Sequence, residues 1–337
     1  MGITISLIAI VALVLISWIG SSVPGLQMVF AVIIPIASIA FFLIGILARV
    51  FKWASAPVPF NITTTAGQQK SHDWIKQNKL DSPSGFWGVV GRMALEVLIF
   101  RSLFRNTKAG ILDKGSKLVY GAEKWLWAFA LAFHWSFLII VLRHFRFFTE
   151  PAPFFVDYLQ IYDSFFQIGL PLIYITDVAI LAALTYLFFR RVFNKQVEYI
   201  SLSSDYFPLL LIASIAITGV LMRYFFKTDI IAVKELMTGL FSFHIVVPAG
   251  ISPLFYVHLF LVCILIAYFP FSKLVHFAGV FFSPTRNMAN NNRAKRHVNP
   301  WNDELNMQYH TYEQYEDEFR GVMKGVGLPL DKEEGTK

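Results

Sequence analysis

The sequence predicts an all-α membrane protein with six transmembrane helices, and three observations carry that prediction. Hydrophobic residues make up 56% of the 337 residues and charged residues only 15%, against about 25% charged residues in an average soluble domain. Six apolar stretches are long enough to cross a hydrocarbon core of roughly 30 Å. Lys and Arg gather in alternate connections between these stretches, as the positive-inside rule requires of successive spans.

The backbone of each span must be helical, because lipid offers no hydrogen-bond partners to an open chain. The spans are expected at residues 3–21, 27–50, 122–143, 164–189, 205–226 and 250–271. Pro24 and Gly25 in the first connection predict a tight turn, so the first two spans form a hairpin. The first span has no charged n-region and no cleavage site, so we expect a retained helix rather than a signal peptide.

The Lys and Arg count gives the orientation of the helices. Segments 48–124, 190–204 and 273–337 hold 12, 3 and 9 of these residues, or 24 in all, whereas the other connections hold 5. Because basic connections stay inside, the chain is expected in the cell (plasma) membrane with both termini cytoplasmic. The same rule explains the net charge of +7 without nucleic acid as a partner.

Four domains are expected. A transmembrane hairpin covers residues 1–50, a cytoplasmic or interfacial insertion covers 51–120, a four-helix core covers 121–280, and a cytoplasmic docking tail covers 281–337. Within the insertion, apolar and basic residues alternate in a pattern typical of an amphipathic helix, either in the membrane interface or on a partner. The aromatic residues of the tail suggest a segment that folds on a partner, and the alternative is a disordered tail.

Four of the eight histidines lie on the third and sixth spans or at their ends, namely His134, His144, His258 and His276. Polar residues inside spans are costly and indicate function. Three connections separate the two spans, so the helices are antiparallel, and the same-side pairs are His144 with His258 and His134 with His276. Because eighteen residues make five full turns, His258 and His276 are expected on one helix face, whereas His134 and His144 differ by about 80°.

These pairs favour two haem groups. Neutral imidazole is a good ligand for haem iron, and ligation by two histidines suits electron transfer because it leaves no position open for oxygen. The single cysteine, Cys263, excludes a Cys-ligated iron–sulfur cluster in this chain. Each histidine could instead be a hydrogen-bonded core residue, and a zinc or di-metal site is a weaker alternative because no carboxylates lie near the pairs.

The spacings of ten and eighteen residues resemble those of the gamma (cytochrome b) subunit of respiratory nitrate reductase, over about residues 121–280. The long chain, with Arg-His-Phe-Arg-Phe at 143–147, is similar to a sub-branch. That sub-branch holds the membrane subunit of the Dsr complex of sulfate reducers and the cytochrome b-like subunit of heterodisulfide-reductase-like menaquinol oxidoreductase.

The resemblance implies two haem b groups, an outer one on His144 and His258 and an inner one on His134 and His276. It also implies menaquinone and a cytoplasmic [4Fe–4S] subunit related to heterodisulfide reductase, linked to sulfur-compound (sulfite or disulfide) metabolism. Further membrane and extracytoplasmic multihaem subunits belong to such complexes. The chain would then be an electron-transfer subunit of a quinone-linked oxidoreductase whose substrate chemistry lies on a partner.

A quinone pocket is expected beside the outer haem, by analogy with the same family. Arg143 belongs to the outer rim and could contact a quinone oxygen, relay its protons or pair with a haem propionate. Arg223 follows Thr218 and Gly219 on the fifth span and is expected to pair with a propionate, while Gly219 allows a flat ring to approach. The other candidates on the outer rim are Arg146, Lys227, Asp229, Lys234, Glu235 and His244.

Asp177 is the one carboxylate expected deep in a span, either in a proton path or hydrogen-bonded to Tyr174 or to a neighbouring helix. It supports the alternative function, a proton-coupled membrane transporter that uses buried His and Asp residues. Transporters usually show inverted repeats and broken helices, and this sequence shows no internal repeat. A membrane anchor without a cofactor is a third possibility.

Overall fold

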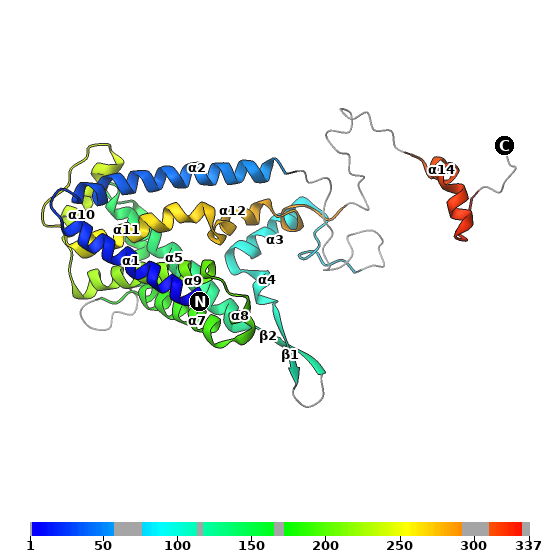
Figure 1. Ribbon diagram of the computed structural model, residues 1–337, viewed down its shortest axis with the longest axis horizontal. Helices are drawn as coiled ribbons and strands as arrows, with labels where there is room; N and C mark the ends of the chain where they lie inside the picture. The colour runs from blue at the N-terminus through cyan, green and yellow to red at the C-terminus, as the bar shows by residue number, and fades with distance from the viewer. Residues whose placement is uncertain (1, 57–75, 113–116, 165–171, 292–309, 332–337) are drawn as a thin grey trace.

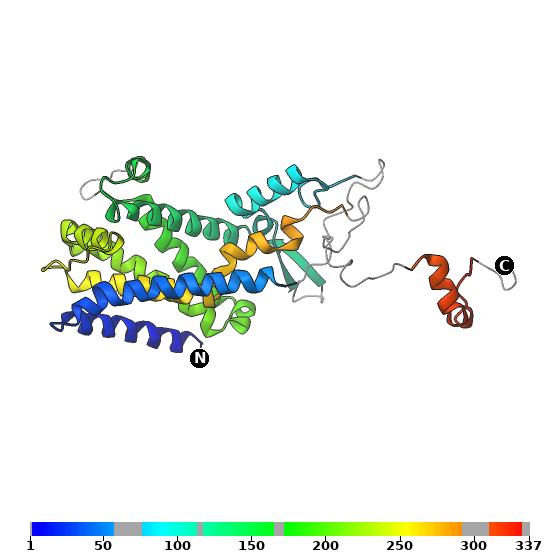
Figure 2. The same cartoon turned by 90° about the horizontal axis from the view of Figure 1, so that it is seen from above.

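The structure is a computed structural model, and it describes residues 2–56, 76–112, 117–164, 172–291 and 310–331 (Figure 1). Its long helices run side by side along the longest axis of the molecule, and the view from above shows the same arrangement (Figure 2). Among the described residues, five helices are long and apolar enough to cross a membrane. The chain is therefore a mostly helical protein with the composition of a multi-pass membrane protein.

The five long helices fall on five of the six expected spans. Several of them continue through a short turn of π or 3-10 helix at one end. They are α1 (Gly2–Ser22), α2 (Ile34–Ala54) after a π turn at Val29–Ile33, α5 (Lys124–His144) followed by a 3-10 turn at Phe145–Phe147, α9 (Ser203–Val220) followed by a π turn at Leu221–Phe225, and α11 (Pro253–Tyr268) followed by a 3-10 turn at Phe269–Phe271.

The span expected at 164–189 differs from its prediction. The helix α7 (Ile175–Phe193) begins eleven residues later, and residues 172–174 are not helical. Residues 165–171 lie outside the described part of the chain. The helix α7 has 19 residues, with Asp177 in its first turn and Arg190 and Arg191 in its last turn, so its apolar stretch is bounded by charges.

The bundle is built around α11. The helix α7 packs along α5 and α9, while α11 packs along α9, α1 and α2. Two clusters of buried apolar side chains share α11, one with α10 (Ile230–Phe241) and the π turn before α2, and the other with α1, α7 and α9. The helices α5 and α11, which carry three of the four singled-out histidines, are thus linked through α7 and α9.

The turn between α1 and α2 brings Phe30 against Gly20. A Cβ atom at Gly20 would lie 2.5 Å from the Phe30 ring, so only glycine admits this contact. Gly25 adopts a φ of +89°, which favours glycine in the tight turn. Beyond the turn, α1 packs on α9 and α11 and α2 packs on α11, so both helices contact the segment predicted as the four-helix core.

Short elements occupy the two ends of the bundle. One end holds α6 (Phe154–Asp163), which connects α5 to α7, and α10. The other end holds α3 (Phe86–Ile99), α4 (Arg101–Phe104), α8 (Lys195–Ile200) and an antiparallel ribbon in which Thr107 pairs with Ala122. The ribbon strands are β1 (Thr107–Leu112) and β2 (Lys117–Ala122).

The chain after α11 forms only short elements and one longer helix. They are a 3-10 turn at Lys273–Val275, α12 (His276–Gly279), a 3-10 turn at Val280–Phe282, α13 (Pro284–Asn287) and α14 (Tyr312–Gly325).

The predicted amphipathic helix is broken into α3 and α4 by Phe100, whose φ of 52° is left-handed. Much of the predicted docking tail, residues 292–309 and 332–337, lies outside the described part. Its helix α14 begins with a capping box in which Thr311 and Gln314 exchange hydrogen bonds. Such a box satisfies backbone donors at a helix start, so α14 carries its own local signal for folding.

Candidate functional site: two histidine pairs

The four singled-out histidines come together in two pairs, with the partners that the antiparallel arrangement predicts. In the outer pair, the ring centroids of His144 and His258 lie 6.4 Å apart and the ring planes differ by 11°. In the inner pair, the centroids of His134 and His276 lie 5.9 Å apart and the planes differ by 83°. Each pair therefore joins α5 to the segment formed by α11 and α12.

These separations fit two imidazoles on opposite sides of one metal ion. With metal–nitrogen bonds of roughly 2 Å, such rings hold their centroids about 6 Å apart. Rings in direct van der Waals stacking would lie closer. Both pairs thus have the spacing that haem iron between two histidines requires.

All four histidines also hold their Nδ1 atoms in hydrogen bonds. Nδ1 lies 2.7 Å from the Ala130 carbonyl oxygen in His134 and 2.7 Å from the Ile140 oxygen in His144. In His276, Nδ1 lies 2.9 Å from the carbonyl oxygen of Lys273. Because a carbonyl oxygen only accepts, Nδ1 carries the proton in these three rings and Nε2 keeps its lone pair. Histidines that ligate metals usually fix their second nitrogen in this way.

His258 is held differently, by a side chain from another helix. Its Nδ1 lies 2.9 Å from Oγ1 of Thr218 on α9. The next residue, Gly219, lies so close that a Cβ atom there would be 3.4 Å from Cε1 of His258. The flat ring that Gly219 accommodates in this structure is therefore the His258 imidazole.

The path from His258 to His276 is not one continuous helix, so the expectation of five full turns between them is wrong. The helix α11 ends at Tyr268, and Ser272 is extended, with ψ at 178°. Pro270 lacks the N–H that would continue the helix, and the Ser272 hydroxyl accepts a hydrogen bond from the Leu274 N–H, which starts a new turn. This break in the helix changes the direction of the chain, and His276 therefore lies beside His134.

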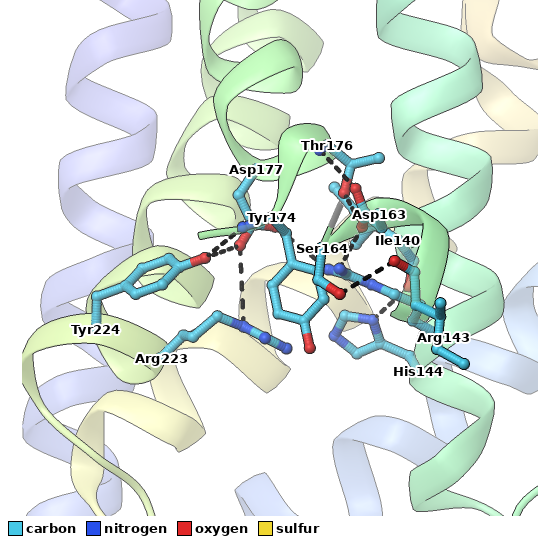
Figure 3. Close-up of polar contacts among 11 residues, drawn as sticks. Ile140, Arg143, His144, Asp163, Ser164, Tyr174, Thr176, Asp177, Arg223 and Tyr224 are labelled. Atoms are coloured by element: carbon cyan, nitrogen blue, oxygen red, sulfur yellow. Dashed lines mark hydrogen bonds and ion pairs between the residues drawn. The ribbon is translucent and has the colours of Figure 1, made fainter. Parts of the chain in front are cut away.

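A charged network lies beside His144 of the outer pair (Figure 3). Arg143, 5% exposed, forms an ion pair with Asp163 of α6 and a second one with Asp177, in which Nη2 lies 3.3 Å from the Asp177 Oδ1. Asp163 also accepts hydrogen bonds from the backbone N–H and the hydroxyl of Thr176, at 2.9 and 2.6 Å. Arg143 thus ties α5 to the start of α7 and to α6.

Arg223 lies on the other side of this network. Its Nε atom lies 3.9 Å from Oδ2 of Asp177, and its guanidinium lies over the Tyr174 ring at 4.2 Å. The Tyr224 hydroxyl donates a 2.8 Å hydrogen bond to the same Asp177 oxygen. Arg146 also interacts electrostatically with Arg223, so positive charge gathers beside His144.

The sequence predicts Asp177 deep in a span, but in the structure α7 starts only two residues before it. It sits in the first turn, where the helix dipole favours a carboxylate, and it pairs with Tyr224, Arg143 and Arg223. Two rim candidates have structural roles as well. Asp229 caps α10, and Lys234 forms an ion pair with Glu150.

The inner pair is covered by the junction between α3 and α4. The Phe100 ring meets the His134 ring edge-on, with centroids 4.9 Å apart. The indole N–H groups of Trp127 and Trp135 on α5 donate to the carbonyl oxygens of Ile99 and Leu98, at 2.7 and 3.0 Å. These bonds satisfy carbonyls that a helix end leaves unpaired, so the end of α3 is fixed beside His134.

An ion cluster holds α4 to the residues before α3. Asp81 forms ion pairs with Arg101 and Arg105. The hydrogen bond from Arg101, together with Arg105 and against the opposing effect of burial, lowers the pKa of Asp81 to about 2. Asn290 joins the cluster, since its N–H donates to the Pro83 carbonyl oxygen at 2.6 Å. The inner pair is therefore bordered by segments that lie outside the long helices, with His134 half-buried and His276 exposed.

The histidines and both arginines are predictable from the sequence, whereas the contacts of Asp163, Thr218, Tyr224 and Phe100 are not. Each acts through a contact between segments distant in the sequence. Within the described part of the chain, no group of three or more His, Cys, Asp or Glu side chains is placed to hold a metal ion.

Comparison with known proteins extends these observations. The family model described as nitrate reductase gamma subunit matches residues 84–295, a wider segment than the 121–280 suggested by the histidine spacing. The chain is 48% identical over 280 residues to a Hdr-like menaquinol oxidoreductase cytochrome b-like subunit of Archaeoglobus fulgidus, covering 81% of this chain and 83% of that one. The protein of the same description from Archaeoglobus profundus is 45% identical over 276 residues, or 80% and 81% of the two chains. This chain therefore belongs to the nitrate reductase gamma subunit family.

Proposed function

We propose that the chain is a dihaem b membrane subunit that passes electrons between menaquinol and a cytoplasmic iron–sulfur partner. One observation carries the proposal: all four paired histidines hold Nδ1 in a hydrogen bond, while their rings stand at the spacing of two ligands on one metal. A hydrogen-bonded core histidine explains one such ring. It does not explain two facing pairs.

His144 and His258 hold the outer haem in this proposal, and His134 and His276 hold the inner haem. Haem b between two imidazoles supplies a reversible one-electron carrier with no position open for oxygen. His134 and His144 are ten residues apart on α5, which corresponds to about 15 Å along the helix. The two pairs therefore span much of the membrane thickness.

The charged side chains of the outer site position the haem carboxylates. Arg223 and Arg146 present positive charge beside His144, and propionate groups need such partners when they leave water. Arg143 is already paired with Asp163 and Asp177. Its contribution is to fix the end of α5, and with it His144, against α6 and α7.

Six membrane crossings with both termini in the cytoplasm complete the proposed topology. The excess of Lys and Arg in alternate connections supports this topology. In it, α7 crosses the membrane in addition to the five long helices. In this orientation the outer pair faces away from the cytoplasm. The inner pair then faces the basic segments 48–124 and 273–337, where a cytoplasmic partner would dock.

Menaquinol is the proposed electron donor or acceptor on the outer side, as the printed names of the relatives suggest. A groove of about 460 Å³ between α5 and α6 has only apolar atoms in its lining, from Leu142, Phe154, Phe155, Tyr158, Leu159 and Tyr162. Such a surface accepts an isoprenoid chain. Asp177 and Tyr224, in the charged network with Arg143, are suited to proton handling, because quinol oxidation releases electrons and protons together.

The partner proposed on the inner side is a [4Fe–4S] subunit related to heterodisulfide reductase, linked to sulfite or disulfide metabolism. Further membrane and multihaem subunits complete the proposed complex. The single cysteine, Cys263, is buried in α11, so clusters must lie on other chains. The transporter alternative needs a carboxylate deep in a span, and Asp177 lies instead in the first turn of α7.

The test is the absorbance of the purified chain. We expect the reduced-minus-oxidised spectrum to show b-type haem, and a soluble menaquinol analogue to reduce it. Absence of haem would overturn the proposal. Haem that dithionite reduces but the quinol does not would keep the haem assignment and remove menaquinol from it.

A further inference from the structure

Three of the four paired histidines are anchored within their own segment, and one is not. His134 and His144 bond the carbonyl oxygen four residues earlier, and His276 bonds the oxygen three residues earlier. A ring held in this way keeps its orientation wherever its helix moves. His258 depends instead on α9, where its Nδ1 lies 2.9 Å from Oγ1 of Thr218, forty positions away, and where the ring also interacts with the Ile215 carbonyl oxygen.

The hydrogen bonds of Thr218 decide which group donates. Its Oγ1 lies 2.9 Å from the Ser214 carbonyl oxygen and 3.0 Å from the Ile215 oxygen. A hydroxyl has one hydrogen, and the two carbonyls can only accept, so that hydrogen points to them. The Thr218 oxygen is left to accept, which means that Nδ1 of His258 donates and Nε2 keeps its lone pair.

Packing holds this arrangement in one geometry. The Thr218 residue is 8% exposed, and its hydroxyl is locked to the preceding turn of α9. Gly219 places bare backbone against the edge of the His258 ring. The ring is thus fixed by a hydrogen bond on one atom and by a close backbone surface beside it, both supplied by α9.

From these contacts we propose that Thr218 is a positioning residue of the outer haem site, acting through His258 on the properties of the iron. The proposal rests on the function proposed above, in which His258 is a haem ligand. Thr218 keeps Nε2 as the free nitrogen and holds the His258 ring nearly parallel to that of His144. It also strengthens the ligand, because an acceptor on Nδ1–H raises the basicity of Nε2.

A more basic ligand favours the ferric over the ferrous state. Removal of the acceptor should therefore raise the reduction potential of the outer haem and leave that of the inner haem unchanged. The low-spin ferric signal in electron paramagnetic resonance depends on the angle between the two imidazole planes. The outer signal should therefore change as well once the His258 ring is free to rotate.

The experiment uses the full-length chain purified with its haems. Thr218→Val keeps the shape and removes the acceptor, Thr218→Ala is a second hydroxyl-free variant in case valine disturbs packing, and Thr218→Ser restores the hydroxyl. Ser214→Ala is the matched control, since Ser214 makes the same kind of bond to a preceding carbonyl, at 2.9 Å from the Leu210 oxygen, without contacting a histidine. The outer haem is identified as the one missing from His144→Ala.

We expect both hydroxyl-free variants to raise the outer potential and alter the outer resonance signal, or to lose the outer haem alone. Thr218→Ser and Ser214→Ala should match the wild type. An outer haem that keeps its potential and signal in either hydroxyl-free variant would overturn the role of Thr218. A wild-type chain without haem would instead overturn the proposed function, so the two failures are distinguishable.

Discussion

The outer and inner histidine pairs share α5 but differ in what holds them. His144 and His258 lie within long helices, beside the buried ions of Arg143, Asp163 and Asp177. His276 lies beyond the interruption of the helix after α11, and the Phe100 side chain contacts the His134 ring. The outer pair is thus fixed by the membrane helices and their ion network. The inner pair depends on segments outside them, which agrees with the partner proposed for that side.

The largest expected effect is in the outer ion network. Asp163→Ala leaves Arg143 buried with one carboxylate instead of two and removes the acceptor of Thr176. Breaking a buried ion pair costs about 3–5 kcal/mol, because a charge remains without compensation. We expect a marked loss of thermal stability in detergent. Glu198→Ala, which breaks the exposed pair with Lys195, is the control and should leave the melting temperature unchanged.

Equal melting temperatures for Asp163→Ala and Glu198→Ala would contradict the structural weight assigned to the outer network. The comparison with the inner pair adds a second requirement. Asp163→Ala should weaken the outer haem first, because His144 follows Arg143 directly on α5. Loss of the inner haem alone would reverse the assignment of this network to the outer site.

A smaller effect is expected at Phe100, which covers the inner pair. Phe100→Gly suits the left-handed backbone but removes the ring, whereas Phe100→Ala removes the ring and keeps the strain. Alanine should therefore be less stable than glycine by about 1 kcal/mol. Both variants should change the spectrum of the inner haem and leave the outer one intact. An unchanged inner spectrum in both would remove Phe100 from the site.

The smallest effect under ordinary conditions concerns pH at the ion cluster of Asp81. The pKa of Asp81 is lowered from 3.8 to about 2, chiefly by Arg101. A lowered carboxyl pKa contributes stability above the unfolded value, and this contribution is lost as pH falls toward the folded value. Comparison of thermal unfolding between the wild type and Asp81→Asn should therefore give a constant difference above about pH 4. The difference should shrink below that pH, and a difference that grows on acidification would contradict the assignment.

Much of this architecture is predictable from sequence, for identifiable reasons. Hydropathy and the alternation of Lys and Arg give the helices and their directions, because both follow from the cost of polar groups in lipid. Antiparallel helices then pair His144 with His258 and His134 with His276. On an ideal helix, the ten-residue spacing rotates the side chains of His134 and His144 about 80° apart. The interruption after α11 means that His258 and His276 do not share the one helix face that the sequence predicts.

The remaining features depend on contacts that a linear pattern does not encode. The predicted start of α7 at residue 164 is too early, because the residues before Ile175 are as apolar as those of a span. This error put Asp177 too deep. Asp163 and Thr218 looked ordinary, since their partners Arg143 and His258 lie on other helices. Phe100 falls inside the predicted amphipathic helix, whereas in the structure it ends α3 and contacts His134.

The pairing itself is tested most directly by counting haem in four single variants of the purified chain. The wild type should hold two haems per polypeptide by pyridine haemochromogen. His144→Ala and His258→Ala should each lose the same haem, recognised by its potential, and His134→Ala and His276→Ala should each lose the other. Loss of different haems within either pair would contradict the account.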